Sequence, residues 1–392
     1  MKKIIMAASL CLGAASLASA QDYVYMTGST AARGIVFNTL KSTAVFDAIP
    51  TVTVYGTGGS GSASSATYMA FAGTINGNST VIQCHWSGSE AGILDVASNS
   101  IVSEKFIDPS YINGLNNTTN QPGAFVFSPV DLAMADNGQA TSFTPSPGLS
   151  NSVPVAVIPF TWVRNNGLWT GANVSWTQVR QALQNGPFST TPRALFDGVT
   201  AHTNDFVYIS GRDSQSGTRA NALGLAITEW GSSFPVGQIE MNNAGVMQLV
   251  DGSYLGNFGF SSGGTLAATL GANTTSQTDA NLGVTGYSVI AYLGRSDANT
   301  AVANGAVELT FNGVAATTDN IINGTYDFWG NEYLFAKNDA SSLVQNIFGK
   351  LANTTTGINN FCDNVTAIKL TDMQSSRDNP DSVQFRKYSY YQ

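Results

Sequence analysis

Residues 205–230, DFVYISGRDSQSGTRANALGLAITEW, decide the fold that we expect for this chain of 392 residues. Residues 205–210 are β-prone, and a stretch that is compatible with a helix runs to about Trp230. Between them, the loop 211–218 holds one arginine, three hydroxyl side chains and two glycines. The stretch therefore predicts a strand, a tight loop and a helix, with polar groups gathered at the helix N-terminus.

This loop is suited to bind an oxyanion. Free backbone N–H groups and the positive end of the helix dipole favour negative charge at a helix N-terminus. Ser216 and Thr218 add hydroxyl donors, Gly217 allows close approach, and Arg212 offers a bidentate guanidinium. The alternative is an ordinary helix cap beside a solvated arginine, because Ser and Thr are common at helix starts.

The strand–loop–helix unit recurs along the chain. Residues 22–27 precede Gly28-Ser29-Thr30 and a helix to about Leu40, and a strand at 80–86 precedes Ser87-Gly88-Ser89 and a helix at 90–97. Other expected elements are strands at 51–55, 124–127, 153–163 and 286–293, a hairpin at 68–86 that turns at 76–78, and helices at 176–183 and 341–351. This pattern predicts α/β architecture with parallel strands, whose ligand crevices lie at the carboxyl ends of the strands.

Several strand ends carry groups that suit one common ligand. The loops Gly28-Ser29-Thr30 and Gly88-Ser89 repeat the chemistry of the 211–218 loop, and Asp136 follows the apolar residues 130–135. A carboxylate only accepts hydrogen bonds, so Asp136 favours an oxyanion that carries a proton, such as hydrogen phosphate, over fully deprotonated sulfate. Taken singly, the glycine loops are ordinary caps, and Asp136 beside Asn137 is a turn residue.

The first twenty residues are typical of a secretory signal peptide. Lys2 and Lys3 precede an apolar stretch that is too short for a membrane anchor, and we expect cleavage after Ala20. Cys11 lacks the small preceding residue of a lipidation site, so we expect a freely diffusing exported protein without membrane insertion. The remaining chain has 15 basic and 25 acidic side chains, and its net charge of −10 disfavours nucleic acid and anionic membrane as partners.

Two further motifs match enzyme signatures only in part. Residues 56–61 fit G-x-G-x-x-G, but the acidic residue that dinucleotide binding requires about twenty positions later is missing. Residues 259–263 fit G-x-S-x-G, but His85 and His202 both precede Ser261, whereas the histidine base of such hydrolases follows the serine. We therefore interpret the first motif as a flexible loop and the second as a turn.

Cysteine and histidine usage disfavours other chemistry. With two histidines and no CxxC or HExxH motif, we expect no metal site and no cofactor. Cys84 and Cys362 remain after signal cleavage, and they form either one disulfide or two separate buried thiols. Length suggests roughly two domains, and residues 138–152, rich in Ser, Thr, Pro and Gly, indicate a connection or hinge between them.

The sequence resembles a known family over most of its length after the signal peptide. GRDSQSGTRA is similar to the signature loop of the phosphate-binding proteins that serve ABC importers, a family of two-lobed periplasmic solute-binding proteins. Other stretches match the same family in order: YMTGSTAARG, SGSEAGI, DLAMADN, VPVAVIPFTWVRN, VSWTQVRQALQNG and GYSVIAYL, the last resembling the return to the first lobe.

This resemblance implies a type II periplasmic-binding-protein fold, with two α/β lobes, each a mostly parallel sheet flanked by helices, and a ligand cleft between them. It implies lobe I at 21–152, lobe II at 153–281 and a return to lobe I at 282–392. The implied phosphate ligands are Thr30, Ala31, Ser89, Asp136, Arg212, Ser216, Gly217 and Thr218. The chain departs from the family at Ala31 and Ala135, and in an inserted loop at 56–79 that contains a competing Gly59-Ser60-Gly61.

We therefore expect a monomeric, non-enzymatic protein that captures inorganic phosphate, or a similar tetrahedral oxyanion, and delivers it to a membrane ABC permease. Two alternatives stay open: a secreted phosphatase-like hydrolase on the same fold, and an interaction or structural protein with a degenerate cleft. Affinity, selectivity over arsenate and the roles of the inserted loop and C-terminal tail are left open by the sequence.

Overall fold

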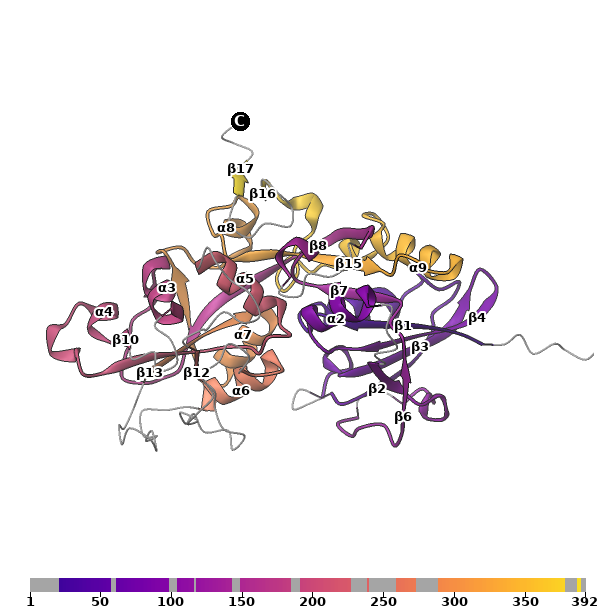
Figure 1. Cartoon of the computed structure of the whole chain (residues 1–392), viewed down its shortest axis with the longest axis horizontal. Coiled ribbons are helices and arrows are strands. Elements are labelled where there is room, and N and C mark those ends of the chain that lie inside the picture. Colours follow the sequence, from indigo (N-terminus) through magenta and orange to yellow (C-terminus); the bar gives the residue numbers. More distant parts are fainter. Residues whose placement is uncertain are drawn as a thin grey trace, which may run out of the picture.

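The computed structural model describes residues 21–57, 61–98, 104–115, 118–142, 149–184, 191–226, 238–239, 259–272, 288–377 and 386–388. These residues form two lobes side by side, which share one large mixed sheet (Figure 1). The strand order is β10-β11-β13-β8-β15-β7-β1-β4-β3-β2. The expected α/β fold with helices flanking the sheet is confirmed.

Lobe I is built around a parallel centre. Its strands are β1 (Asp22–Gly28), β2 (Thr51–Tyr55), β3 (Tyr68–Ile75), β4 (Asn78–His85), β7 (Leu132–Ala135) and β15 (Trp329–Ala336), and its helices are α1 (Arg33–Leu40), α2 (Ser89–Ala97) and α9 (Ser342–Ala352). Strand β1 lies between β4 and β7 and is parallel to both. The predicted hairpin joins β3 to β4 through Asn76 and Gly77, whose positive φ angles of 52° and 77° suit a tight two-residue turn.

Lobe II repeats the plan with β11 at its centre. Its strands are β9 (Asn173–Val174), β10 (Thr191–Pro192), β11 (Phe206–Ser210), β12 (Gln238–Ile239), β13 (Ser288–Gly294) and β14 (Val307–Phe311), and its helices are α3 (Trp176–Gln184), α4 (Ala194–Asp197), α5 (Gly217–Ala226), α6 (Gly263–Ala272) and α7 (Arg295–Ala303). Strand β11 is parallel to β12 and β13. Small accessory elements complete the described chain: β5 (Glu104–Ile107) with β6 (Phe125–Ser128), α8 (Thr318–Ile322), and β16 (Ser375–Arg377) with β17 (Arg386–Tyr388).

One long strand, β8 (Asn151–Arg164), belongs to both lobes (Figure 1). Its residues 151–159 pair with β15, on the side of lobe I, and its residues 160–164 pair with β13 and β14 in lobe II. The run VPVAVIPFTWVR within β8 is almost entirely apolar because helices and loops cover both faces of the sheet there. The predicted hinge segment thus leads directly into the strand that connects the lobes.

The segment expected to return to lobe I includes β13. Strand β13 pairs with β11 and with residues 160–164 of β8. The chain rejoins lobe I at β15, which pairs with β7. The apolar pattern of β13 specifies a buried strand, but it does not specify which neighbour the strand takes, so we now propose a return near β15.

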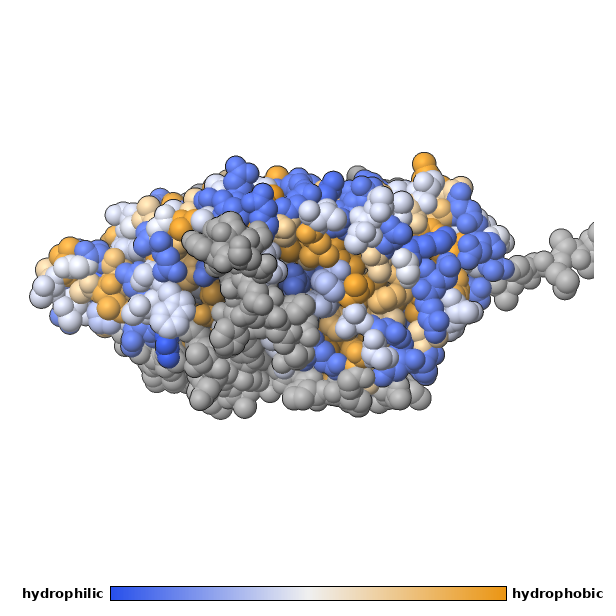
Figure 2. Space-filling model, turned by 90° about the horizontal axis from the view of Figure 1, so that it is seen from above, coloured by the Kyte–Doolittle hydropathy of each residue, from blue (hydrophilic) through white to orange (hydrophobic). Residues whose placement is uncertain are grey.

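The core extends through both lobes. A large cluster of buried apolar residues includes Met26 and Ile82 in lobe I and Trp162, Tyr292 and Phe328 around β8. Seen from above, the described surface mixes hydrophilic and hydrophobic side chains (Figure 2). Cys84 and Cys362 are both free and buried, as in the second of the two alternatives for these residues. Within the described ranges, no helix is long and apolar enough to cross a membrane.

Candidate functional site

The predicted loops meet where the two lobes face each other. Gly28 ends β1, Ser89 begins α2 after β4, and Asp136 follows β7, so lobe I presents all three at the carboxyl ends of its parallel strands. From lobe II, the loop 211–216 after β11 approaches the same place. The backbone N–H of Glu90 donates to the carbonyl of Gln215 at 3.0 Å, which joins the lobes directly.

The first loop is shaped by Gly28 and Ser29. Gly28 has φ of +118°, and a Cβ there would lie 1.9 Å from the carbonyl oxygen of Met134, so only glycine lets β1 approach β7 this closely. Ser29 Oγ accepts from the N–H groups of Ala31 (3.1 Å) and Ala32 (3.2 Å) and donates to Asp136 Oδ1. The N–H of Ala31, which we predicted to donate to a ligand, is therefore engaged by Ser29.

Asp136 lies at the centre of the site and is almost fully buried. Besides Ser29, its carboxylate accepts from Thr218 Oγ1, at 3.1 Å to Oδ2, across the boundary between the lobes. Its backbone N–H donates to Ser89 Oγ (3.1 Å), and its carbonyl accepts from Asn221 Nδ2 (2.9 Å). Residues from the loop after β1, from α2 and from α5 thus hold Asp136 in place.

Arg212 is fixed by backbone carbonyls that the sequence did not reveal. Its Nε donates to the carbonyl of Phe260, and its Nη2 donates to the carbonyl of Ser261, both at 2.9 Å. Its Nη1 donates to Thr30 Oγ1 in lobe I at 3.4 Å. A guanidinium has five N–H donors, so Arg212 retains donors for a ligand. The motif at 259–263, interpreted as a turn, therefore serves as the support of this arginine.

The remaining part of the 211–218 loop packs tightly against lobe I. A Cβ on Gly217 would lie 2.5 Å from Ser89 Oγ and 2.8 Å from Asn137 Oδ1, so glycine is required for this approach. Ser216 Oγ accepts from the N–H of Arg219 (3.3 Å), as an N-cap does at the start of α5.

Three predicted hydroxyls share one property. Thr30, Ser89 and Ser216 each accept a hydrogen bond from a protein N–H group. Among the residues that the structure describes, no acceptor is recorded for the hydroxyl proton of any of the three. Each hydroxyl is therefore oriented by the protein and keeps its own proton to donate.

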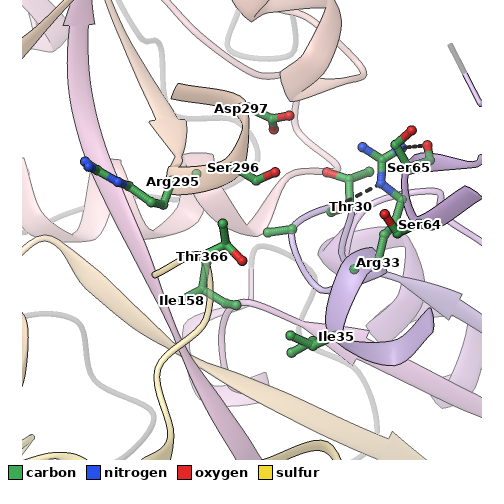
Figure 3. A pocket seen from close by; sticks show the side chains of 13 residues that line it. Thr30, Arg33, Ile35, Ser64, Ser65, Ile158, Arg295, Ser296, Asp297 and Thr366 are labelled. Carbon is green, nitrogen blue, oxygen red and sulfur yellow. Dashed lines mark hydrogen bonds between the residues drawn. The ribbon is translucent and has the colours of Figure 1, made fainter. Parts of the chain in front are cut away.

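A pocket of about 90 Å³ adjoins the site, between the first turns of α1 and α7 (Figure 3). Its walls include Thr30, Arg33, Ile158 and Asp297. Arg33 is held by the carbonyls of Thr30 and Ser65, both at 3.0 Å. Burial lowers the pKa of Arg33 and raises the pKa of Asp297, while Arg33 and Arg212 oppose the rise at Asp297. Two guanidinium groups, those of Arg33 and Arg295, and one carboxyl group, that of Asp297, thus line this pocket.

The histidines lie apart from the G-x-S-x-G motif. His85 Nδ1 lies 3.0 Å from Glu104, and the ring stacks on Tyr68, while His202 Nδ1 lies 2.8 Å from Asp197. No cluster of metal-ligating side chains occurs among the described residues. Residues 58–60 of the G-x-G-x-x-G motif, residues 1–20 and Gly59-Ser60 of the competing loop lie outside the described residues.

The arrangement combines hydroxyl and amide donors, one guanidinium and one acceptor carboxylate in a small volume between two lobes. It suits a small oxyanion that carries at least one proton, because the donors take the charged oxygens and Asp136 takes the O–H. The sequence identified Thr30, Ser89, Asp136, Arg212 and 216–218 as neighbours. It missed Ser29, Asn221, the 260–261 carbonyls and the buried Glu332.

Comparison with known proteins shows the fold. No protein-family profile matches the sequence, and no relative is detected among curated proteins. Among solved structures, the chain is similar to a protein from Clostridium perfringens assigned as a phosphate ABC transporter substrate-binding protein, with bound phosphate: TM-score 0.50, 12% identity, 89% of this chain and 100% of that chain. Similarity is also found to an ABC-type phosphate transport receptor from Vibrio cholerae, with a TM-score of 0.45 and 12% identity over 85% of this chain and 94% of that chain. PstS from Borrelia burgdorferi is similar with a TM-score of 0.40 and 12% identity over 89% of this chain and 98% of that chain.

Proposed function

We propose that this protein binds inorganic phosphate, or a similar protonated tetrahedral oxyanion, between its two lobes. The observation that carries the proposal is the set of three oriented hydroxyls, Thr30, Ser89 and Ser216, which come from three separate loops and keep their protons for an acceptor. The buried Arg212 supplies positive charge beside them. The sequence resemblance and the similarity in fold to a protein solved with phosphate add support.

Selectivity in this proposal comes from Asp136. A buried carboxylate accepts a hydrogen bond from a protonated oxyanion, whereas it repels an oxyanion without a proton. Phosphate carries a proton near neutral pH and sulfate does not. Discrimination between them then requires no difference in size or shape.

We further propose that the protein is exported after signal cleavage and delivers its ligand to a membrane ABC permease. This part rests on the sequence of residues 1–20 and on the resemblance. Binding in an interlobe cleft suits such a role, because a carrier must enclose its ligand in one arrangement of the lobes and release it in another. No chemical step is required of the protein.

Calorimetric titration of refolded, ligand-free protein with phosphate and with sulfate tests the proposal. We expect saturable binding of phosphate and an affinity for sulfate at least about tenfold lower, equivalent to ~1.4 kcal/mol. Absence of phosphate binding would support the interpretation as a degenerate cleft. Release of phosphate from a phosphomonoester above the uncatalysed rate would instead support the hydrolase interpretation.

A further inference from the structure

A second carboxyl group, that of Glu332, lies beside Asp136. Glu332 in β15 is 0% exposed. Strand β15 runs antiparallel to β7, with Tyr333 opposite Ala135, so the next residues along the two strands are Glu332 and Asp136. Both residues lie directly beyond the last pair of this ladder, and the two carboxyl groups interact directly.

Glu332 lacks the partners that an ionised carboxylate needs. Neither of its oxygens has a hydrogen-bond donor of its own among the described residues. The nearby Ser29 hydroxyl gives its proton to Asp136, and its influence on Glu332 lowers the pKa of this group less than burial and Asp136 raise it. The titratable groups that interact with Glu332 from neighbouring elements are Asp136 and the thiol of Cys362. A second buried negative charge in such surroundings is costly, and a shared proton removes it.

The surroundings decide which carboxyl group carries that proton. Asp136 accepts hydrogen bonds from the hydroxyls of Ser29 and Thr218, whereas neither oxygen of Glu332 has a donor among the described residues. Burial, followed by the charge of Asp136, raises the pKa of Glu332 well above its ordinary value. The proton therefore resides on Glu332, whose neutral carboxyl group can donate, as other buried carboxylic acids do near active sites.

We infer that Glu332 is held neutral and donates its proton in a hydrogen bond to Asp136, so that the pair carries a single negative charge directed at the oxyanion site. A carboxylate offers about four acceptor positions. Three of these positions accept hydrogen bonds from Ser29, Thr218 and Glu332. The fourth position remains open for an O–H group of the ligand. Glu332 is then a positioning residue that fixes both the charge and the open acceptor of Asp136. Its role in selectivity rests on the proposed function, whereas its protonation does not.

Infrared spectroscopy of the ligand-free protein tests the protonation. We expect a C=O stretch of a protonated carboxylic acid at pH 7 that disappears in Glu332→Gln and persists in the control Glu308→Gln, whose carboxylate pairs with Arg295 on the lobe II side. Other buried carboxyl groups with a raised pKa, such as Asp95 and Asp297, absorb in the same region when protonated, so the band of Glu332 is the part of this absorption that Glu332→Gln removes. A wild-type spectrum without this absorption, or an absorption that Glu332→Gln leaves undiminished, would overturn the inference.

Stability provides a second measurement that needs no ligand. The unfolded chain releases the Glu332 proton near the ordinary glutamate pKa of 4.5, whereas the folded chain retains it. Wild-type stability therefore falls as pH rises from that value toward the raised pKa, by up to about tenfold in the unfolding constant per pH unit. This decrease in stability with rising pH should be absent in Glu332→Gln and should remain in Glu308→Gln. Parallel pH profiles for wild type and Glu332→Gln would contradict the inference.

Ligand titrations test the positioning role. In Glu332→Gln, the amide can replace the donated proton, so we expect phosphate affinity and the preference over sulfate to stay within about threefold of wild type. Glu332→Met has similar volume but no donor, and we expect a loss of about tenfold in phosphate affinity. Equal impairment of both variants would contradict the positioning role. If wild type binds no oxyanion but shows the infrared band, the proposed function fails while the protonated pair stands.

Discussion

At the scale of single residues, Arg212 is preorganised. Two backbone carbonyls and Thr30 hold its guanidinium, so little side-chain entropy remains to be lost when a ligand binds. We expect Arg212→Ala to weaken phosphate binding by ~2 to 5 kcal/mol, at least about 30-fold, because it removes a buried charge-assisted interaction. Calorimetric titration measures this, with Lys105→Ala in β5, outside the candidate site, as control. Tight binding by Arg212→Ala would remove this residue from the site.

Asp136 is expected to control selectivity more than affinity. In Asp136→Asn, the side-chain amide can donate to a fully deprotonated oxyanion, so sulfate should bind better and phosphate worse. The ratio of their affinities should narrow by roughly 10- to 100-fold, in keeping with ~1.5 to 3 kcal/mol for a hydrogen bond to a charged group. Asp319→Asn, an exposed substitution in α8, should leave the ratio unchanged. An unchanged ratio in Asp136→Asn would show that its carboxylate does not contact the ligand.

The role of a residue could be predicted from the sequence where the type of its side chain already indicates a binding site. Hydroxyls, an arginine and glycines in the short loop 211–218 indicate an anion site without knowledge of the fold. The carbonyls of Phe260 and Ser261 give no such signal, because every residue has a carbonyl. Glu332 lies almost 200 residues from Asp136, and only the pairing of β15 with β7 brings the two together.

At the scale of secondary-structure elements, the close contact of α5 with α2 depends on Gly217. A Cβ there would overlap Ser89 and Asn137 across the lobe boundary. We expect Gly217→Ala to reduce phosphate affinity by about 5- to 150-fold, since overpacking costs ~1 to 3 kcal/mol and this cost applies to the arrangement in which the lobes touch.

The matched control is Gly349→Ala in α9, where a Cβ would meet no neighbouring atom. Alanine in place of an exposed helical glycine should raise the free energy of unfolding by ~0.5 to 1 kcal/mol and leave binding unchanged. Thermal unfolding and titration of both variants separate the two effects. If Gly217→Ala binds phosphate as tightly as wild type, α5 and α2 do not approach each other this closely in the bound protein.

Helices, strands and turns could be predicted from the sequence where a short stretch of residues specifies them. The hairpin at Asn76-Gly77, the helices after Gly28 and Gly88 and the long apolar strand β8 all follow from turn residues and periodicity. The neighbours of β13 were not predictable, because a strand buried on both faces has the same sequence pattern in either lobe.

At the scale of the whole molecule, direct contacts between the lobes define a closed arrangement. Three hydrogen bonds cross the boundary between the lobes: Glu90 to Gln215, Thr218 to Asp136, and Arg212 to Thr30. A ligand that binds this arrangement better than an open one shifts the population toward it. We expect phosphate to reduce the radius of gyration of wild type in small-angle X-ray scattering, and to leave Arg212→Ala unchanged at the same concentration. Scattering that phosphate does not alter in wild type would mean that the lobes are already closed without it.

The shared strand β8 has a consequence for how the protein loses its structure. Because residues 151–159 complete the lobe I part of the shared sheet and residues 160–164 complete its lobe II part, neither lobe can unfold without withdrawing a central strand from its neighbour. The two lobes are thus joined into one thermodynamic unit, and heat should unfold them together in a single cooperative step.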